Sequence, residues 1–204
     1  MGLFRARVRI LCMILAAAMN PDELSAVEDS VTRLRQGDLD ALAAVMAQYQ
    51  HRLYRFLMRL AQDPALADDL FQQTWLRVME RIGRYDGRRQ FAPWLFSVAR
   101  NLAIDTLRKR RLGSLDAVED GGVAPIDRLV GAEQDPLEKL LEFERGAVLA
   151  AAIADLPVIH REVLTLRFEE EMKLEQIAEV IDVPLSTVKS RLGRALEGLR
   201  GRLQ

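Results

Sequence analysis

Residues 173–200 read KLEQIAEVIDVPLSTVKSRLGRALEGLR, two helical patterns separated by a short break. The break covers residues 182–185, and Pro184 within it cannot continue the first helix. Ala178 is small where two helices must cross closely, and Ser186 is placed to cap the second helix. The shared core is expected to contain Ile177, Ile181, Val188 and Leu192. This spacing predicts a helix-turn-helix.

The second helix of this motif carries charge of mostly one sign. From residue 186 to the end, five basic residues oppose one acidic residue, a charge of +4. A plain helical hairpin inside a bundle would not explain that bias, whereas the second helix of a DNA-binding motif points its first residues at base edges in the major groove. Lysine and arginine bind guanine edges or phosphates, and the sequence does not divide the two roles. The candidate contacts are Ser186, Thr187, Lys189, Ser190, Arg191 and Arg194.

Upstream of this motif the chain is also predicted to be helical. Apolar residues recur at helical spacing over 24–62, with a stop and restart at Gly37, and again over 65–82, 91–111, 143–154 and 158–168. No alternating run of β-branched residues interrupts them. A length of 204 residues allows one medium domain or two small ones. The fold class is therefore all-α, with two small helical domains at 24–111 and 143–204 and an N-terminal extension at 1–23.

The segment at 112–142 separates the two domains. It is rich in glycine, proline and acidic residues, and we expect a flexible acidic linker there. Its charge is −6, while residues 84–111 carry +6. The total charge of −1, which alone would argue against a nucleic-acid partner, is therefore a sum of opposite local charges.

The basic segment 84–111 is interleaved with aromatic residues. Cations neutralise phosphates, and exposed aromatic rings stack on unpaired bases. The aromatic residues are Tyr85, Phe91, Trp94 and Phe96, and they flank Arg88, Arg89 and Arg100. The pattern indicates a surface for single-stranded nucleic acid. The alternative is that Trp94 and Phe96 are only core residues. For Phe96, the pattern favours a core role at least as much as a role in stacking.

Composition excludes several classes of protein and of site. A single cysteine, Cys12, excludes an internal disulfide and a thiolate zinc site, and two histidines 109 positions apart do not suggest a metal cluster. No glycine-rich phosphate loop or nucleophile elbow is present. We therefore expect no cofactor, no metal and no enzymatic activity, in a reducing compartment, the cytoplasm.

The first eighteen residues differ from the rest. Three arginines precede an apolar run at 10–18, which has the outline of a signal peptide but is too short to span a bilayer. The second interpretation is that Met19 is the true start, because helix-initiating sequence follows it directly. An ordinary frayed terminus is the third.

Two blocks of the sequence resemble a known family. Residues 67–111, ADDLFQQTWLRVMERIGRYDGRRQFAPWLFSVARNLAIDTLRKRR, and the segment from LPVIHREVLTLRF at 156–168 to residue 200 are similar to regions two and four of the sigma-70 family of bacterial RNA polymerase sigma factors. The resemblance extends over residues 34–204 and is to the small extracytoplasmic-function (ECF) type. It implies binding to core RNA polymerase, recognition of the −35 and −10 promoter elements, promoter melting, and regulation by an anti-sigma factor.

The resemblance also implies roles for individual residues. Asp68, Asp69, Gln72 and Trp75 match the helix that docks on polymerase, although Gln73 and Met79 replace the family's frequent Glu and Trp. The C-terminal helix matches the −35 reader. The positions that match the −10 and single-strand surface are Tyr85, Arg88, Arg89, Phe91, Trp94, Arg100, Asn101, Asp105, Arg108, Lys109, Arg110 and Arg111.

Two other classes of function remain as alternatives. A free-standing helix-turn-helix regulator would bind duplex DNA without polymerase, but it offers no reason for the aromatic and basic cluster at 85–96. A helical enzyme or scaffold would carry its basic helices incidentally. Binding to promoter DNA with and without core polymerase separates these possibilities.

Overall fold

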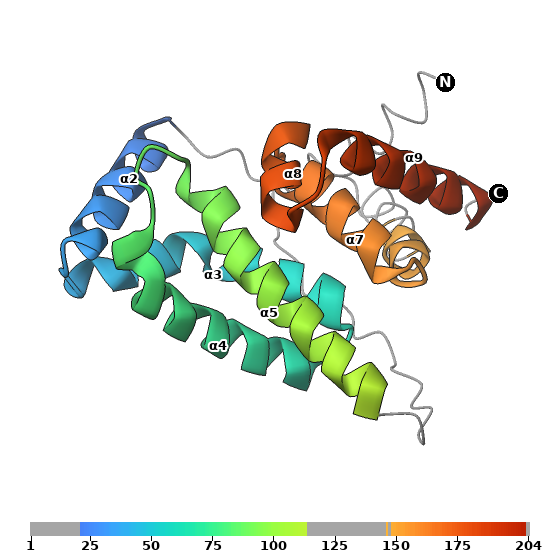
Figure 1. Ribbon diagram of the computed structural model, residues 1–204, viewed down its shortest axis with the longest axis horizontal. Helices are drawn as coiled ribbons and strands as arrows, with labels where there is room; N and C mark the ends of the chain where they lie inside the picture. Colours follow the sequence, from blue (N-terminus) through green and yellow to red (C-terminus); the bar gives the residue numbers. More distant parts are fainter. Residues whose placement is uncertain (1–20, 114–145, 147, 203–204) are drawn as a thin grey trace, which may run out of the picture.

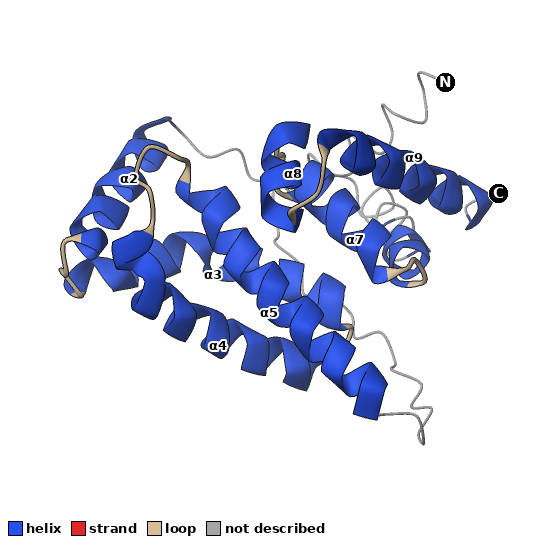
Figure 2. Ribbon diagram, viewed as in Figure 1, coloured by secondary structure: helices blue, strands red, loops and turns tan. Residues whose placement is uncertain are grey.

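The computed structural model describes residues 21–113, 146 and 148–202, with side chains from residue 28 to 111 and again from 148 (Figure 1). Within these ranges the secondary structure is helical, and no strand occurs (Figure 2). None of the described helices is long and apolar enough to cross a membrane. Helix α5 (Phe91–Gly113) includes residues 112 and 113, where the linker was predicted to begin, and the rest of the predicted linker lies outside the described residues. The segment before residue 21, with the Met19 alternative, and residues 143–145 and 147 of the helix predicted at 143–154 also lie outside them.

The N-terminal region contains four helices and one short turn of 3-10 helix. They are α2 (Pro21–Arg35), α3 (Asp40–Ala61), α4 (Pro64–Arg81), the turn Ile82–Arg84 and α5 (Phe91–Gly113). Gly37 separates α2 from α3 with a φ of +92°, a conformation that glycine adopts without strain. Asp63 begins α4, where its Oδ1 accepts a hydrogen bond from the Leu66 backbone N–H at 3.2 Å and Pro64 occupies the first turn. These local signals confirm the predicted breaks.

The C-terminal region begins, among described residues, with a helical stretch at 148–154 and continues with α7 (Val158–Leu164), α8 (Leu174–Ile181) and α9 (Leu185–Arg202). Asp182 ends α8 in the left-handed conformation, with a φ of 52°. The turn and the second helix of the predicted helix-turn-helix are present. Ser186 as the cap of that helix was wrong, because α9 begins at Leu185 and the Pro184 carbonyl already accepts bonds from Thr187 and Val188.

A second difference lies at the end of α7. The prediction was one regular helix over 158–168, but the chain widens into a π-helical turn at Thr165–Glu169, where the Glu170 N–H donates to the Thr165 carbonyl at 3.0 Å. Such turns insert a residue into an α-helix and change the direction of the side chains that follow. The turn places Glu169 and Glu170 toward α3, where they pair with Arg59 at 3.0 Å and Arg52 at 2.8 Å.

The two regions lie against each other, with α8 on α5 and α7 on α3 (Figure 1). Buried residues of both regions form one continuous hydrophobic cluster, which contains Phe56, Leu57, Phe96, Val163, Leu166, Ile177, Ile181 and Val188. A second, smaller cluster of Ala152, Leu156, Leu164, Ala195 and Leu199 joins α9 to α7. The two predicted regions are therefore in contact through a common core.

Candidate nucleic-acid interface

Helix α9 has a buried face and a polar face. Val188, Ala195 and Leu199 are buried against α7 and α8, as expected from positions seven and four residues apart. The opposite face carries most of the predicted contacts, of which Ser186, Lys189, Ser190 and Arg194 are exposed and Thr187 is half-buried. The helix-turn-helix therefore presents a basic, hydroxyl-bearing surface to solvent.

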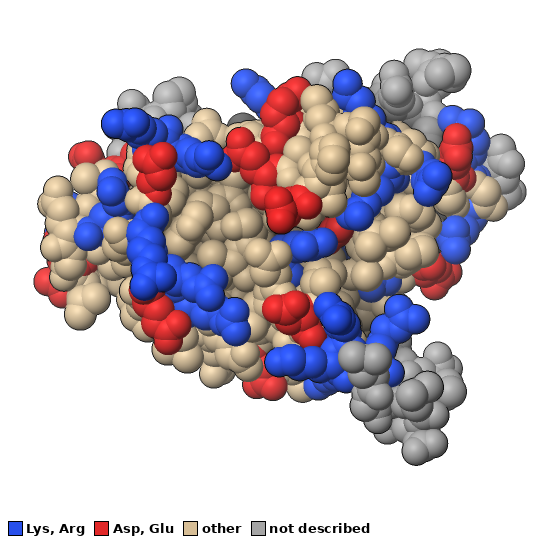
Figure 3. Space-filling view, viewed as in Figure 1, with Lys and Arg blue, Asp and Glu red and all other residues tan. Residues whose placement is uncertain are grey.

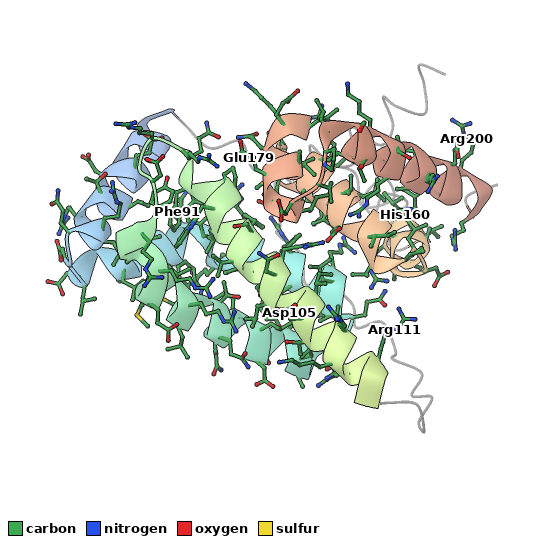
Figure 4. The ribbon with its side chains drawn as sticks, in the orientation of Figure 1. Phe91, Asp105, Arg111, His160, Glu179 and Arg200 are labelled. Atoms are coloured by element: carbon green, nitrogen blue, oxygen red, sulfur yellow. The ribbon has the colours of Figure 1, made fainter. Side chains whose placement is uncertain are left out.

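The positive charges of α9 affect the pKa of His160 on α7. Burial lowers the pKa of its imidazole first, and Arg194 and Arg191 lower it further. A neutral form is favoured because a protonated ring would add a third positive charge beside the two guanidinium groups. His160 is labelled on α7, beside α9, in Figure 4.

The loop between α4 and α5 is fastened by an aromatic cluster. The Tyr85 ring lies 5.6 Å from Phe91 and 5.1 Å from Trp94, and its hydroxyl donates to the Arg89 carbonyl. Tyr85 and Phe91 are buried, and only Trp94 of these three is partly exposed. Of these three rings, only that of Trp94 is accessible for stacking on an unpaired base. Tyr85 and Phe91 instead hold the loop in place. Phe96 is fully buried in the core, as its alternative interpretation predicted.

The same loop exposes its arginines. The Asp86 carboxylate accepts a hydrogen bond from the Arg88 N–H at 3.1 Å, which fixes a tight turn between the aromatic residues. Arg84, Arg88 and Arg89 are exposed, and Arg89 pairs with Glu179 of α8 at 3.7 Å. Trp94 and Arg89 line a shallow cleft of about 250 Å³, together with Gln90, Pro93, Ser97, Gln176 and Glu179. Aromatic and cationic groups thus meet at one opening, which α8 closes from the other side.

Helix α5 carries the remaining candidates along its length. Asn101, Asp105, Arg108, Lys109, Arg110 and Arg111 are exposed. Basic side chains gather at the C-terminal end of the helix in the space-filling view (Figure 3), and Asp105 and Arg111 are labelled in Figure 4. Arg110 pairs with Asp63 at 2.9 Å. The Arg110 hydrogen bond, helped by the Leu66 N–H, holds the pKa of the Asp63 carboxyl below its usual value.

Two of the candidate DNA-binding arginines, Arg100 and Arg191, are mostly buried. Arg100 of α5 donates to Glu162 at 3.0 Å, and Arg191 of α9 donates to the same carboxylate at 3.0 Å. Glu162 lies on α7 and its side chain is 0% exposed. The structure therefore brings one arginine from each candidate DNA surface onto a single buried carboxylate.

Helix α4 shows the candidate polymerase-docking residues. Asp68, Asp69 and Gln72 are exposed, whereas Trp75 is 4% exposed and packs in the core beside Phe71. Two large apolar residues on the outer face were not among the predicted docking residues: Leu76 is 55% exposed, and Met79, noted only as a departure from the family, is 38% exposed. Their spacing of seven and ten residues from Asp69 could have identified them, because such positions share one helical face.

Comparison with known proteins accounts for both regions. The family model for sigma-70 region 2 matches residues 45–112, and the model for sigma-70 region 4 matches residues 152–201. The chain belongs to the sigma-70 family. As a sigma factor of the ECF group, it directs RNA polymerase to promoters and is not an enzyme.

Similar sigma factors match over most of their length. The ECF RNA polymerase sigma factor SigW of Bacillus subtilis is 29% identical over 181 residues, which cover 87% of this chain and 97% of SigW. The RNA polymerase sigma-H factor of Pseudomonas aeruginosa is 32% identical over 177 residues, 85% of this chain and 92% of that factor.

Two solved structures share the fold. CnrH, solved in complex with the cytosolic domain of CnrY, superposes with a TM-score of 0.61 at 21% identity, over 87% of this chain and 97% of that chain. RpoE of Bartonella quintana, solved with the anti-sigma factor NepR, gives 0.63 at 23% identity, over 78% and 93%.

Proposed function

We propose that this sigma factor divides promoter recognition between its two basic helices. In this proposal α9 reads the −35 duplex, α5 with the loop before it holds the −10 strand, and the outer face of α4 docks on core polymerase. The observation that carries it is the pair of basic surfaces, one in each family region, built on different kinds of scaffold. One is a helix-turn-helix, which suits duplex DNA, and the other combines a part-exposed Trp94 with arginines, which suits a single strand.

The −35 role rests on the polar face of α9. Lys189 and Arg194 lie five residues apart on that face and are exposed, and Ser190 lies beside Lys189. A helix laid in the major groove would bring such side chains to base edges and flanking phosphates. Ser186 lies in the first turn of α9, where the backbone N–H groups favour a phosphate.

The −10 role rests on the cleft at Trp94. A base taken out of the stack needs a ring to stack on and cations for its phosphates. Trp94 offers the ring, and Arg88 and Arg89 offer the cations. Asn101 follows about two turns later on α5, with both donor and acceptor groups for a base edge.

The docking role rests on the outer face of α4. Leu76 and Met79 are apolar residues open to solvent, and Asp69 and Gln72 border them. An exposed apolar patch with a polar rim is typical of a protein interface. Trp75 supports this helix from the core side. A partner that covers the patch would remove Leu76 from water.

The compartment and the regulator follow from the same function. A sigma factor acts where RNA polymerase is, and we propose the cytoplasm as the compartment of this chain for that reason. One solved relative of this fold is bound to an anti-sigma factor, NepR. We include an anti-sigma factor among the partners of this chain for that reason.

Reconstituted transcription tests the proposal. The chain is combined with core polymerase and fragmented genomic DNA of its source organism, and transcript starts are sequenced. We expect starts that share two upstream elements and that require the chain, while the chain alone binds the same promoters weakly. Tight, sequence-specific binding without core polymerase would instead favour the free-standing regulator.

A matched pair of substitutions tests the docking face. Leu76→Asp should weaken binding to core polymerase by at least about tenfold, because a carboxylate would have to be buried in the interface. Leu39→Asp is the control, since Leu39 is 69% exposed in the same region but lies at the start of α3 and not on α4. Equal affinity of the two variants for core polymerase would exclude this face of α4.

A further inference from the structure

Glu162 is a buried acid at the junction of the two regions. Its Oε2 accepts a hydrogen bond from Arg100 Nε at 3.0 Å, and its Oε1 accepts one from Arg191 Nη1 at 3.0 Å. The side chains of Arg100 and Arg191 are only 16% and 22% exposed. A buried carboxylate needs such partners, because leaving the charge without them carries a large desolvation penalty.

The two arginines belong to surfaces that work far apart on DNA. The −35 and −10 elements are separated by about 25 base pairs, which is roughly 85 Å of B-form DNA at about 3.4 Å per pair. Two guanidinium nitrogens that each lie 3.0 Å from one carboxylate are less than about 9 Å apart. Arg100 and Arg191 cannot serve both elements while they share Glu162.

We propose that this structure is a closed, promoter-incompetent form of the sigma factor, and that Glu162 is the latch that holds the two DNA-reading arginines together. The inference rests on the proposed function of α5 and α9. Opening of the latch releases Arg100 and Arg191 at the same time, so access to the −10 surface is coupled to access to the −35 surface. In the closed form α8 also covers one side of the Trp94 cleft with Gln176 and Glu179.

In two other ion pairs across the junction, the N-terminal region again supplies the arginine and the C-terminal region the acid. Arg52 pairs with Glu170 at 2.8 Å and Arg59 with Glu169 at 3.0 Å, each an arginine of the N-terminal region with an acid of the C-terminal region. In the opposite direction, Arg161 Nη2 donates to the Leu60 carbonyl at 3.2 Å. These ion pairs surround the shared apolar core of the junction, and a polyanion that competes for the arginines would weaken the ionic part of the contact. Promoter DNA is such a polyanion.

The connection between the regions is long enough for the open form. Residues 114–145 join Gly113 to Gly146, and a chain of that length reaches at most about 110 Å when extended. That limit exceeds the separation of the two promoter elements. Covalent connectivity therefore permits the regions to separate.

The first test removes the charge of the latch. Glu162→Gln is compared with Glu197→Gln, which removes one exposed acid from α9 and so matches the change in net charge. Both are made in a Cys12→Ser chain with dyes on Leu39→Cys and Gly201→Cys, one in each region. Circular dichroism confirms that the helices are retained.

We expect Glu162→Gln to lower the energy transfer between the dyes. It should also bind a mixed-sequence 30-base-pair duplex at least about tenfold more tightly than Glu197→Gln, because the apparent affinity rises with the open fraction. Release of two arginines should steepen the slope of log affinity against log salt by about 2. Equal transfer efficiency and equal affinity in the two variants would overturn the latch.

The second test locks the closed form. Gln176 Nε2 donates a hydrogen bond to Gln90 Oε1 across the junction. In the Cys12→Ser chain, Gln90→Cys and Gln176→Cys are joined by a reducible bis-maleimide, and each single variant capped with a mono-maleimide serves as control. Promoters found by reconstituted transcription are the template.

We expect the cross-linked chain to lose at least about nine-tenths of its transcription with core polymerase, and reduction to restore it. Transcription by the cross-linked chain at the level of the reduced one would overturn the closed form. A parent chain that is inactive with core polymerase would instead count against the proposed function, so the two failures are distinct.

Discussion

The two basic helices, α5 and α9, acquire their charge in different structural settings. All the bases of α5 except Arg100 are gathered in its last turns, at 108–111, where a helix dipole favours cations and where Arg110 also pairs with Asp63. The bases of α9 begin at Lys189, in the second turn, where the dipole gives no such help. Each helix commits one arginine to Glu162.

This difference separates structural charge from functional charge. The cluster at the end of α5 would stabilise its helix even without DNA, so charge alone is weak evidence for a nucleic-acid site there. Lys189 and Arg194 have no comparable role in holding α9, and their exposure on a helix-turn-helix is the stronger evidence. On α5 the evidence comes instead from the aromatic residues beside the loop.

The largest predicted effect is on the free energy of unfolding, in a comparison of two aromatic residues of α5, Phe96 and Trp94. Phe96→Ala should lower the free energy of unfolding by about 3–5 kcal/mol, because it empties a fully buried site against Phe56, whose ring lies 5.1 Å away. Trp94→Ala should destabilise less and should weaken binding of the polymerase complex to a single-stranded −10 oligonucleotide by about 1–3 kcal/mol. Urea unfolding measures the loss of stability, and fluorescence anisotropy measures the binding to the oligonucleotide. Equal loss of stability in both variants would remove Trp94 from the DNA surface.

The next effect concerns α9. Lys189→Ala combined with Arg194→Ala should reduce transcription from −35-dependent promoters by at least about tenfold, since each lost contact is worth about 1 kcal/mol or more. The midpoint of thermal unfolding should stay within a few degrees, because both residues are exposed. Lys173→Ala, an exposed lysine before α8, is the control. A comparable loss from Lys173→Ala would show that only net charge matters.

A smaller effect is expected at the end of α5, where structure and function overlap. Arg110→Ala should lower the free energy of unfolding by about 0.5 kcal/mol, as is typical of a surface ion pair, and should reduce the salt slope of DNA binding by about 1. Asp63→Asn is the matched variant, because asparagine keeps the cap of α4 while removing the pair. It should share the loss of stability and keep the DNA affinity. If Asp63→Asn weakens DNA binding as Arg110→Ala does, this division of roles is wrong.

The smallest effect is a pH dependence at the same pair. The pKa of Asp63 is lowered from 3.8, mainly by Arg110, so the carboxylate stabilises the fold above pH 3.8 and this contribution is lost as the pH falls through the lowered value. Unfolding followed from pH 6 to pH 2 should therefore show a slightly shallower decline in Asp63→Asn than in the parent chain. Because the pair is well exposed, the difference should be small.

Much of the helical framework could be predicted from the sequence because its signals are local. Gly37, Pro64 and Pro184 mark breaks through their own backbone preferences, and periodic apolar residues mark the buried faces. The predicted cap, Ser186, lies two residues after Pro184, whose carbonyl accepts the first hydrogen bonds of α9. The π-helical turn after α7 has no comparable local signal in its side chains.

The candidate sites were less predictable because exposure depends on distant parts of the chain. The aromatic residues Tyr85 and Phe91 look suited to stacking in sequence, but they pack on each other and on Tyr49. Trp75 falls on the inner side of α4 by its spacing, although the resemblance also placed it among the docking residues. The pairing of Glu162 joins residues 62 and 29 positions apart, and no sequence pattern indicates it.

Tethered cleavage of a promoter tests most directly whether the two helices read two elements. An iron–EDTA chelate is attached to Ser190→Cys on α9 or to Asn101→Cys on α5 in the Cys12→Ser chain, and each is assembled with core polymerase on a promoter found by transcript sequencing. Cleavage from α9 should fall at the −35 element and cleavage from α5 at the −10 element, about 25 base pairs downstream. Cleavage by both chelates at one position, or at neither element, would contradict the division of promoter recognition between α5 and α9.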